Sequence, residues 1–323
     1  ISPATGGRKF TSTAFGAAQP IKIRIRNLDD ATTTGDLQAR YVINGGAPVV
    51  ETITAPNIAA GATFDYTFTT TADLSAVGTY QITASVTRTG DPVAANDTIR
   101  RTVKQLDNPA ISLTSTFLDD LETATAQEWT YRVCGLDGLD RYDFVNSSSL
   151  GRIRSFINSG LAYSGSKALT LDASTYAPSG NTDSLTGTFN LNSYTAATDD
   201  IRLDFRYKNH AQNPNAANKV WIRGNDTQPW IQVYDLFANQ NAADGSYKLS
   251  TSIELTDSLQ AYGQDFSSSF QVRWGQWGKY LTADNDGGAG YSFDDIRLYK
   301  VTNDLQMMSI DTPVSNSCAL SAT

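Results

Sequence analysis

The sequence predicts an all-β protein, with an immunoglobulin-like β-sandwich followed by a larger jelly-roll β-sandwich. Composition and pattern both support this fold class. Only four of the 33 acidic residues are glutamate, and Thr, Ser, Asn and Gly take the place of strong helix formers. Short apolar segments alternate with polar residues at a period of two, and turn-forming clusters separate these segments.

The first domain, residues 1–105, has the pattern of a small sandwich. In Ile21–Asn27 three isoleucines alternate with Lys22, Arg24 and Arg26, which is typical of a strand with one buried face. Further predicted strands are Leu37–Ile43, Val49–Ile53, Phe64–Phe68, Tyr80–Val86 and Thr98–Val103. This number of short strands in about 100 residues favours an immunoglobulin-like fold. Its connecting segments carry no cluster of reactive side chains, so we expect a spacer domain.

The second domain, residues 110–304, follows a short linker at Gln105–Pro109. Its predicted strands include Leu169–Leu171, Leu185–Leu191, Ile201–Tyr207, Val220–Arg223, Trp230–Tyr234, Phe270–Trp274 and Phe293–Tyr299. Nearly 200 residues of short strands and polar turns are typical of a two-sheet jelly roll.

Five segments of the second domain carry a resemblance. They are Asp183–Leu185, Ile201–Phe205, Val220–Gly224, Phe270–Gly275 and the closing Tyr291–Ile296, which contains Phe-Asp-Asp-Ile. This series resembles the cleaved-adhesin and MAM-type jelly rolls of large cell-surface proteins from Bacteroidota. The resemblance implies secretion by the type IX system and an extracellular location on the cell surface. The first domain is similar to the immunoglobulin-like spacers that alternate with such jelly rolls.

The two ends of the chain indicate an internal repeat. Residues 316–323 align with residues 11–18, and Ser, Ala and Ala are identical in the two segments. The spacing from Thr13 to Cys318 gives a period of 305 residues. We therefore expect residues 305–323 to be a linker and the start of a next repeat. The expected partners are neighbouring repeats of the same chain and other filament chains.

Charge and composition disfavour two kinds of partner. The net charge is −8, and the cations alternate along strands without forming a patch, so the sequence does not indicate a nucleic-acid partner. No apolar segment approaches the length of a membrane span. The two cysteines, Cys134 and Cys318, lack the spacing of a zinc or redox motif, and a buried thiol and a disulfide both remain open.

The residues do not point to a catalytic site. The single histidine, His210, lies in a polar segment where we expect an exposed loop, and no Gly-x-Ser-x-Gly motif accompanies it. Carboxylate pairs at Asp119–Asp120, Asp199–Asp200 and Asp294–Asp295 are compatible with a glycosidase by residue type alone. Because no aromatic cleft is tied to them, we expect that the chain is not an enzyme.

Calcium binding is a better explanation than catalysis for these carboxylate pairs, because this hard cation takes six to eight oxygen ligands. Asp120 and Glu122 lie near the start of the second domain, and Asp294 and Asp295 lie near its end. The resemblance implies that a metal joins first and last strands through Glu122 and Asp294, with Asp120 and Asp295 as further ligands. The Asp284–Gly288 loop, through Asp284 and Asp286, is another candidate, for which solvated turn aspartates are an equal alternative.

Four tryptophans of the second domain could form a sugar-stacking surface. Trp221 and Trp274 lie inside alternating strands, so we expect them in the core. Trp230 and Trp277 follow polar or glycine-containing turns and are the candidate ligand-binding residues.

The leading functional hypothesis is a structural and adhesive repeat module of a secreted bacterial surface filament, used in attachment, gliding or prey capture. A carbohydrate-binding module that recognises surface glycans is the alternative, and a hydrolase fragment is a third interpretation.

Overall fold

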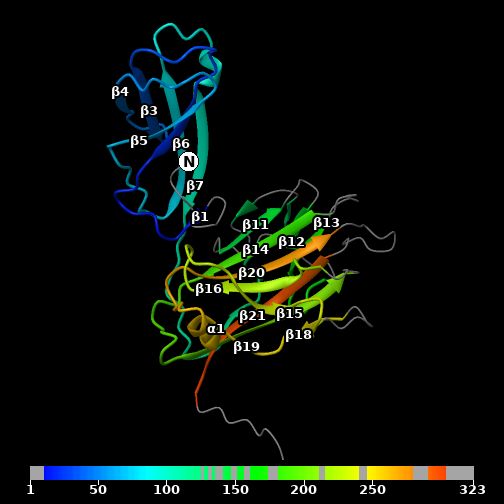
Figure 1. Cartoon of the computed structure of the whole chain (residues 1–323). Helices are drawn as coiled ribbons and strands as arrows, with labels where there is room; N and C mark the ends of the chain where they lie inside the picture. The colour runs from blue at the N-terminus through cyan, green and yellow to red at the C-terminus, as the bar shows by residue number, and fades with distance from the viewer. Residues whose placement is uncertain are drawn as a thin grey trace, which may run out of the picture.

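The computed structural model of the chain is shown in Figure 1. It describes residues 11–124, 127–129, 133–134, 141–146, 151–155, 161–173, 181–210, 215–239, 246–278 and 290–302. Within these ranges the secondary structure is almost entirely β, with one short α-helix and one 3-10 turn. This confirms the all-β class, and the strands form two sandwiches in succession along the chain.

The first domain contains a five-stranded and a two-stranded sheet. The larger has the order β1 (Thr11–Ser12), β7 (Thr98–Gln105), β6 (Gly78–Thr87), β3 (Leu37–Ile43), β4 (Val49–Ile53). The smaller pairs β2 (Lys22–Arg26) with β5 (Thr63–Thr67), and a 3-10 turn, η1 (Ala94–Asn96), lies between β6 and β7. Pairing is antiparallel except between β1 and β7.

The strand alternation predicted for this domain is realised in its core. Ile21 and Ile23 are buried in a cluster with Leu37, Tyr41 and Phe68. The rings of Tyr41 and Phe68 meet edge to face, with 4.8 Å between centroids. The two sheets of the first domain are therefore held together mainly by apolar packing.

Glu51 adds a polar link between the two sheets. It lies on β4, and its carboxylate accepts hydrogen bonds from the Tyr66 hydroxyl at 2.6 Å and from the backbone N–H groups of Thr69 and Thr70 at 2.9 Å each. The hydroxyl of Thr69 also donates to it, at 2.8 Å. Burial opposes ionisation of Glu51, but the hydrogen bonds from Tyr66 and the 69–70 turn outweigh it and lower its pKa to about 2.

The second domain packs a six-stranded sheet against an eight-stranded one. The first has the order β10 (Val133–Cys134), β11 (Tyr142–Asn146), β14 (Asn181–Phe189), β20 (Phe270–Gly278), β16 (Lys219–Arg223), β17 (Ile231–Asp235). The second has the order β18 (Lys248–Leu249), β15 (Asp200–His210), β21 (Gly290–Val301), β13 (Leu169–Ala173), β12 (Gly151–Ser155), β9 (Gln127–Trp129). Two short strands complete it, with β8 (Phe117–Asp119) pairing with β21 and β19 (Ile253–Glu254) pairing with β15.

Aromatic side chains fill the space between these two sheets. Trp274 of the six-stranded sheet is fully buried and lies 5.8 Å from Phe205 and 6.0 Å from Phe293 of the eight-stranded sheet, measured between ring centroids. The edge-to-face contact with Phe205 and the tilted contact with Phe293 add to the free energy gained by burying the rings. The core of the second domain is separate from that of the first.

The linker between the domains is held by one asparagine. The Asn108 side chain donates to the Ser268 carbonyl at 2.6 Å, and the Asn108 carbonyl accepts from the Asn190 side chain at 2.8 Å. Leu106 is buried, and its N–H donates to the Ser12 carbonyl of the first domain. The backbone of Ile111 already belongs to the second domain, where its N–H donates to the Asn190 carbonyl.

One element differs in kind from the sequence expectation. Residues Leu255–Ala261 form helix α1, with Leu255 and Leu259 buried one turn apart. The helix is short and its N-terminal residue makes no side-chain cap, so its sequence lacks the usual start signal. Its stability comes from packing against the sandwich.

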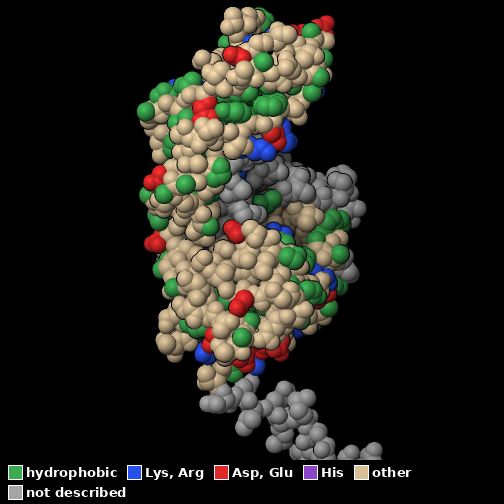
Figure 2. Space-filling model, turned by 60° about the vertical axis from the view of Figure 1, so that its left-hand side comes forward, with side chains coloured by type: hydrophobic (Ala, Val, Ile, Leu, Met, Phe, Trp, Pro, Cys, Tyr) green, Lys and Arg blue, Asp and Glu red, His purple; other side chains and the backbone are tan. Residues whose placement is uncertain are grey.

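Figure 2 shows the surface of the molecule from another side. On this face, acidic and basic side chains are scattered over both domains. Among the described residues, no helix is long and apolar enough to cross a membrane.

We expect Glu51→Gln to lower the free energy of unfolding of the first domain by about 1–2 kcal/mol at pH 7, because the charged acceptor of several hydrogen bonds is lost. Since folding lowers the pKa of Glu51, the stabilisation is present above pH 4.5 and is lost as pH falls towards 2. Urea denaturation across this pH range measures the difference. Asp107→Asn, at an exposed position just after the last strand of the domain, is the control. An equal effect of both variants would contradict the assigned role of Glu51.

Candidate functional site

The outward face of the six-stranded sheet carries a row of polar and aromatic side chains. On β20, Phe270, Val272 and Trp274 are buried in the core, so Gln271, Arg273, Gly275 and Trp277 occupy the other face. Strand register places Thr186 of β14, Arg273 of β20 and Trp221 of β16 side by side across three strands. Gln232 of β17 continues this row.

Gly275 provides the space that Trp221 occupies. A Cβ atom at position 275 would lie 2.7 Å from Cζ3 of Trp221, which is too close for any side chain. The six-membered ring of Trp221 therefore covers the backbone at Gly275. Trp277 follows two residues later on the same face. The backbone N–H of Trp277 donates to the side-chain oxygen of Asn218 at 2.9 Å. Trp221 and Trp277 are each half-buried.

A third half-buried indole, that of Trp230, contacts two arginines at the next step along the sheet. The guanidinium carbons of Arg273 and Arg223 lie 3.9 Å and 4.3 Å from the Trp230 ring centroid. The Arg223 guanidinium donates twice to the Gln271 side-chain oxygen, at 2.8 and 2.5 Å, and the Gln271 amide donates to the Thr188 hydroxyl. These hydrogen bonds hold the face in one conformation.

Burial lowers the pKa of Arg273 to about 10, with the neighbouring Arg223 charge as a second cause. Both side chains remain cationic at neutral pH. We name the outward residues Trp221, Arg223, Trp230, Gln271, Arg273 and Trp277 the tryptophan–arginine face. It offers apolar ring surface beside hydrogen-bond donors, which is the composition of small-ligand and oligosaccharide sites.

The structure differs from the sequence expectation in which of the four tryptophans lie in the core and which face outward. Trp274 lies in the core, as expected, and Trp230 and Trp277 lie on the tryptophan–arginine face. The expectation that Trp221 is also a core residue is wrong, because it points outward over Gly275. The sequence alternation indicates this outward position. Val220 and Ile222 are the buried residues of this strand, so Trp221 between them faces the other side.

The acidic residues at the two ends of the second domain also come together. First and last strands pair, with Asp119 of β8 opposite Ile296 of β21, so Asp120 and Asp295 adjoin this pairing. On the same edge of β21, β13 pairs with residues 290–293. Asp294 and Asp295 therefore lie between two neighbouring strands. β21 has an irregular register with β15 at this point, and Asp295 has a left-handed φ of +46°.

A loop at residues 163–167 contacts these acidic residues. Asp294 accepts hydrogen bonds from the N–H groups of Tyr163 at 2.7 Å and Ser164 at 3.1 Å, and the Ser164 hydroxyl donates to Asp295 at 2.7 Å. A third N–H, that of Asp295 itself, donates to Asp294 at 2.8 Å. Asp294 is fully buried, and burial raises its pKa to about 6 despite these hydrogen bonds.

Glu122 binds the other end of the same loop. Its carboxylate accepts from the N–H groups of Ser166 and Lys167 and from the Ser166 hydroxyl, each at 2.8 Å. Burial disfavours the charged form, but these hydrogen bonds outweigh it and lower the pKa of Glu122. Gly165 has a φ of +56°, and a Cβ there would lie 2.5 Å from the Glu122 carboxylate, so glycine is required at this position.

The structure thus brings Glu122 and Asp294 to one loop, and their oxygens accept N–H and O–H groups of that loop. Asp120 accepts the N–H of Glu122 at 3.2 Å. Within the described residues, no group of three or more His, Cys, Asp or Glu side chains is arranged to hold a metal ion. Calcium at Glu122 and Asp294 stays a prediction of the sequence, and Asp284 and Asp286 lie outside the described residues.

His210 differs from its expected position. It lies at the end of β15, is buried, and its Nε2 is 2.7 Å from the Ser292 hydroxyl. The expectation of an exposed loop histidine is therefore wrong, because the strand extends through the polar residues Lys208–His210. Cys134 lies in β10, whereas Cys318 is outside the described residues.

Comparison with known proteins gives only low-scoring likeness to solved structures. No protein-family model matches the chain, and no curated protein matches it. One similar solved structure is a carbohydrate-binding module of the β-sandwich superfamily, described for promiscuous specificity; identity is 12%, TM-score is 0.33, and the match covers 88% of this chain and 98% of that one. Another is the CBM22-1 xylan-binding domain from Paenibacillus barcinonensis Xyn10C, with 11% identity, TM-score 0.29, and 56% and 99% coverage. At these TM-scores the likeness says nothing about the ligand of this chain.

We expect Asp294 to make the second domain less stable as pH rises from about 4 to about 6. Its pKa is about 6 in the folded chain against an ordinary value of 3.8, so the folded state binds the proton more tightly. The stabilisation is complete below pH 3.8 and is lost through pH 6, with a size of about 1–3 kcal/mol. Urea denaturation of wild type and Asp294→Asn measures it in EDTA, where no cation holds the carboxylate in its charged form. Identical pH profiles for the two proteins would contradict this assignment.

Chelation tests the predicted calcium site. We expect EDTA to lower the melting temperature of the wild type and added calcium to restore it, because an ion that binds the folded state stabilises it by mass action. Glu122→Gln should remove this response, and Asp73→Asn in the first domain should retain it. A wild-type melting temperature that does not change in EDTA would exclude Glu122 and Asp294 as strong ligands.

Proposed function

We propose that this chain is a non-catalytic adhesive module of a secreted bacterial surface protein, and that it binds glycans through the tryptophan–arginine face. The observation that carries the proposal is the set of three half-buried indoles on one face of a sheet. A soluble protein gains more free energy by burying such rings than by leaving them partly in water. Their outward position is therefore best explained by a ligand that covers them.

The chemistry of this face fits a polysaccharide. The C–H groups on one face of a pyranose ring form an apolar surface that can stack on an indole. Arg273 lies beside the indoles, is partly exposed and can donate hydrogen bonds to sugar hydroxyl or carboxylate oxygens, whereas Gln271 is fully buried and serves as a support. The hydrogen bonds from Arg223 to Gln271 and from Gln271 to Thr188 tie the three strands beneath this face together, which lowers the entropy cost of binding.

The carboxylates of the second domain support binding over catalysis. Asp199 pairs with Lys300 and Asp204 with Arg297, at 2.6 Å each. Asp119 pairs with Arg141 at 3.0 Å. Carboxylates in such pairs have structural partners, in contrast to the acid and nucleophile of a glycosidase, which face a substrate cleft. The first domain, with its own core, would act as the spacer that presents the binding domain.

Binding to a glycan array tests the proposal. We expect the wild type to bind at least one polysaccharide class, and Trp221→Ala and Trp277→Ala each to weaken binding about three- to tenfold, which corresponds to about 0.5–1.5 kcal/mol of ring stacking. Tyr299→Ala is the matched control, because Tyr299 is also a half-buried aromatic residue but lies on β21 in the opposite, eight-stranded sheet. Absence of binding across plant, algal and bacterial polysaccharides would refute the proposal, as would equal loss in the control.

A further inference from the structure

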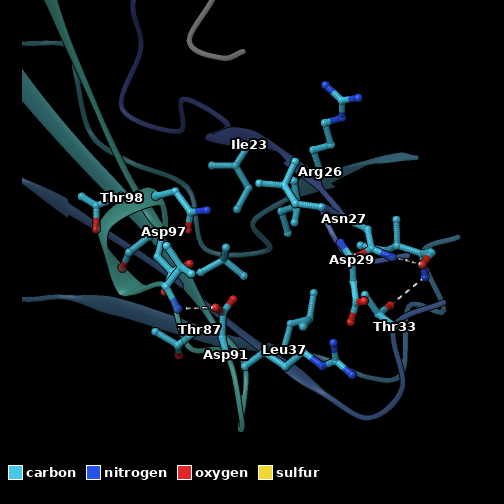
Figure 3. A pocket seen from close by; sticks show the side chains of 18 of the residues that line it. Ile23, Arg26, Asn27, Asp29, Thr33, Leu37, Thr87, Asp91, Asp97 and Thr98 are labelled. Carbon is cyan, nitrogen blue, oxygen red and sulfur yellow. Dashed lines mark hydrogen bonds between the residues drawn. The ribbon is translucent and has the colours of Figure 1, made fainter. Parts of the chain in front are cut away.

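A groove of about 670 Å³ opens in the first domain between β2 and the far ends of β6 and β7. Figure 3 shows Ile23 and Leu37 pointing into it, with Thr87, Asp97 and Thr98 on the facing wall. Apolar side chains from both sheets line the groove, among them Ile25 and Ile99.

One end of the larger sheet is uncovered at this groove. Val103 and Ile99 lie on the same side of β7, four residues apart. Val103 is fully buried in the core, whereas Ile99 is 54% exposed. On the facing strand, Ile21 and Ile23 are buried and Ile25 only half-buried. The smaller sheet therefore leaves this end of the larger sheet uncovered, and the groove lies there.

β2 presents a free backbone edge to the same space. The Ile21 carbonyl accepts from the Phe68 N–H and the Asn27 N–H donates to the Ala62 carbonyl, both at 2.9 Å, so odd-numbered residues bond to β5. By antiparallel alternation, the N–H and C=O groups of Lys22, Arg24 and Arg26 point to the other edge. In the part of the chain that the structure describes, no strand pairs with that edge. An unpaired edge next to an apolar groove is the geometry that strand addition uses.

The chain itself contains a segment suited to this groove. Leu305–Ile310 has four large apolar side chains in six residues, contains neither glycine nor proline, and is uncharged. It follows β21, whose end lies at the end of the second domain remote from the first domain (Figure 1). Because the end of β21 lies far from β2 of the same chain, a second copy is the partner considered for this groove. In the repeat predicted from the sequence, residues 316–323 align with residues 11–18, and the segment precedes this match.

We propose that β2 binds Leu305–Ile310 of a second copy of this chain as a third strand of the β2–β5 sheet. The added strand bonds to the free backbone groups of Lys22, Arg24 and Arg26 and places alternate side chains over Ile99 and Ile25. The contact is heterologous, since the tail of one copy enters the groove of the next, and it generates a head-to-tail array. In a polypeptide with tandem copies, the same contact forms between consecutive modules at millimolar effective concentration.

Sedimentation velocity of the full chain tests the proposal. We expect the average mass to rise with concentration up to about 1 mM, the range of effective concentrations in a tandem array. Ile99→Lys in the groove and Met307→Asp in the tail should each weaken association at least tenfold. An equimolar mixture of the two variants should form dimers and no larger species, because only one intact tail and one intact groove remain per pair.

Val50→Lys is the control, since Val50 is 51% exposed on β4, outside the groove. It should associate as the wild type does, and all variants should retain the wild-type melting temperature. A wild type that stays monomeric over the whole range would overturn the proposal. So would association that either variant leaves unchanged, or larger oligomers in the mixture of the two.

Discussion

The pairing of β21 with strands from distant parts of the chain is the constraint on which the second domain depends. One edge of β21 pairs along its length with β15, and the other edge is shared by β13 and β8. These partners precede β21 by about 80 to 180 residues, so the eight-stranded sheet closes only when the end of the domain is in place. Asp294 and Asp295 lie where the two partners on the shared edge meet. Their hydrogen bonds to residues 163–164 fill a gap in the ladder that would otherwise expose backbone groups.

The same packing fixes the tryptophan–arginine face on the opposite sheet. Trp274 is held in the core between Phe205 of β15 and Phe293 of β21. Because side chains alternate along β20, this places Arg273 and Gly275 on the outer face. Trp221 then covers Gly275, and the register of β16 with β20 sets Arg223 beside Gln271. The ring surface offered to a ligand thus follows from aromatic packing inside the sandwich.

The fold was predictable from sequence wherever one face of a strand is buried. The strands at Leu37–Ile43 and Val49–Ile53 have the predicted bounds, because both alternate and a glycine turn at residues 44–46 separates them. Helix α1 and β8 were not predicted, since their stability comes from tertiary contacts and not from local pattern. The pairing of Glu122 with Asp294 as metal ligands came from the family resemblance and stays a prediction. The 163–167 loop that joins them could not be predicted, because Gly165 acquires its role only when Glu122 packs against it.

The two proposed surfaces place different demands on the two domains. A glycan-binding face must be rigid, and the hydrogen-bonded row on β14, β20 and β16 meets this need within a large aromatic core. A groove that accepts a strand must instead leave backbone groups unpaired, which a small two-stranded sheet can do because its stability depends on what it packs against. Asn108 ties the linker to the second domain. Tension between copies would then pass through the strand added to β2 and the linker, while the binding face stays outside the direct path of the load.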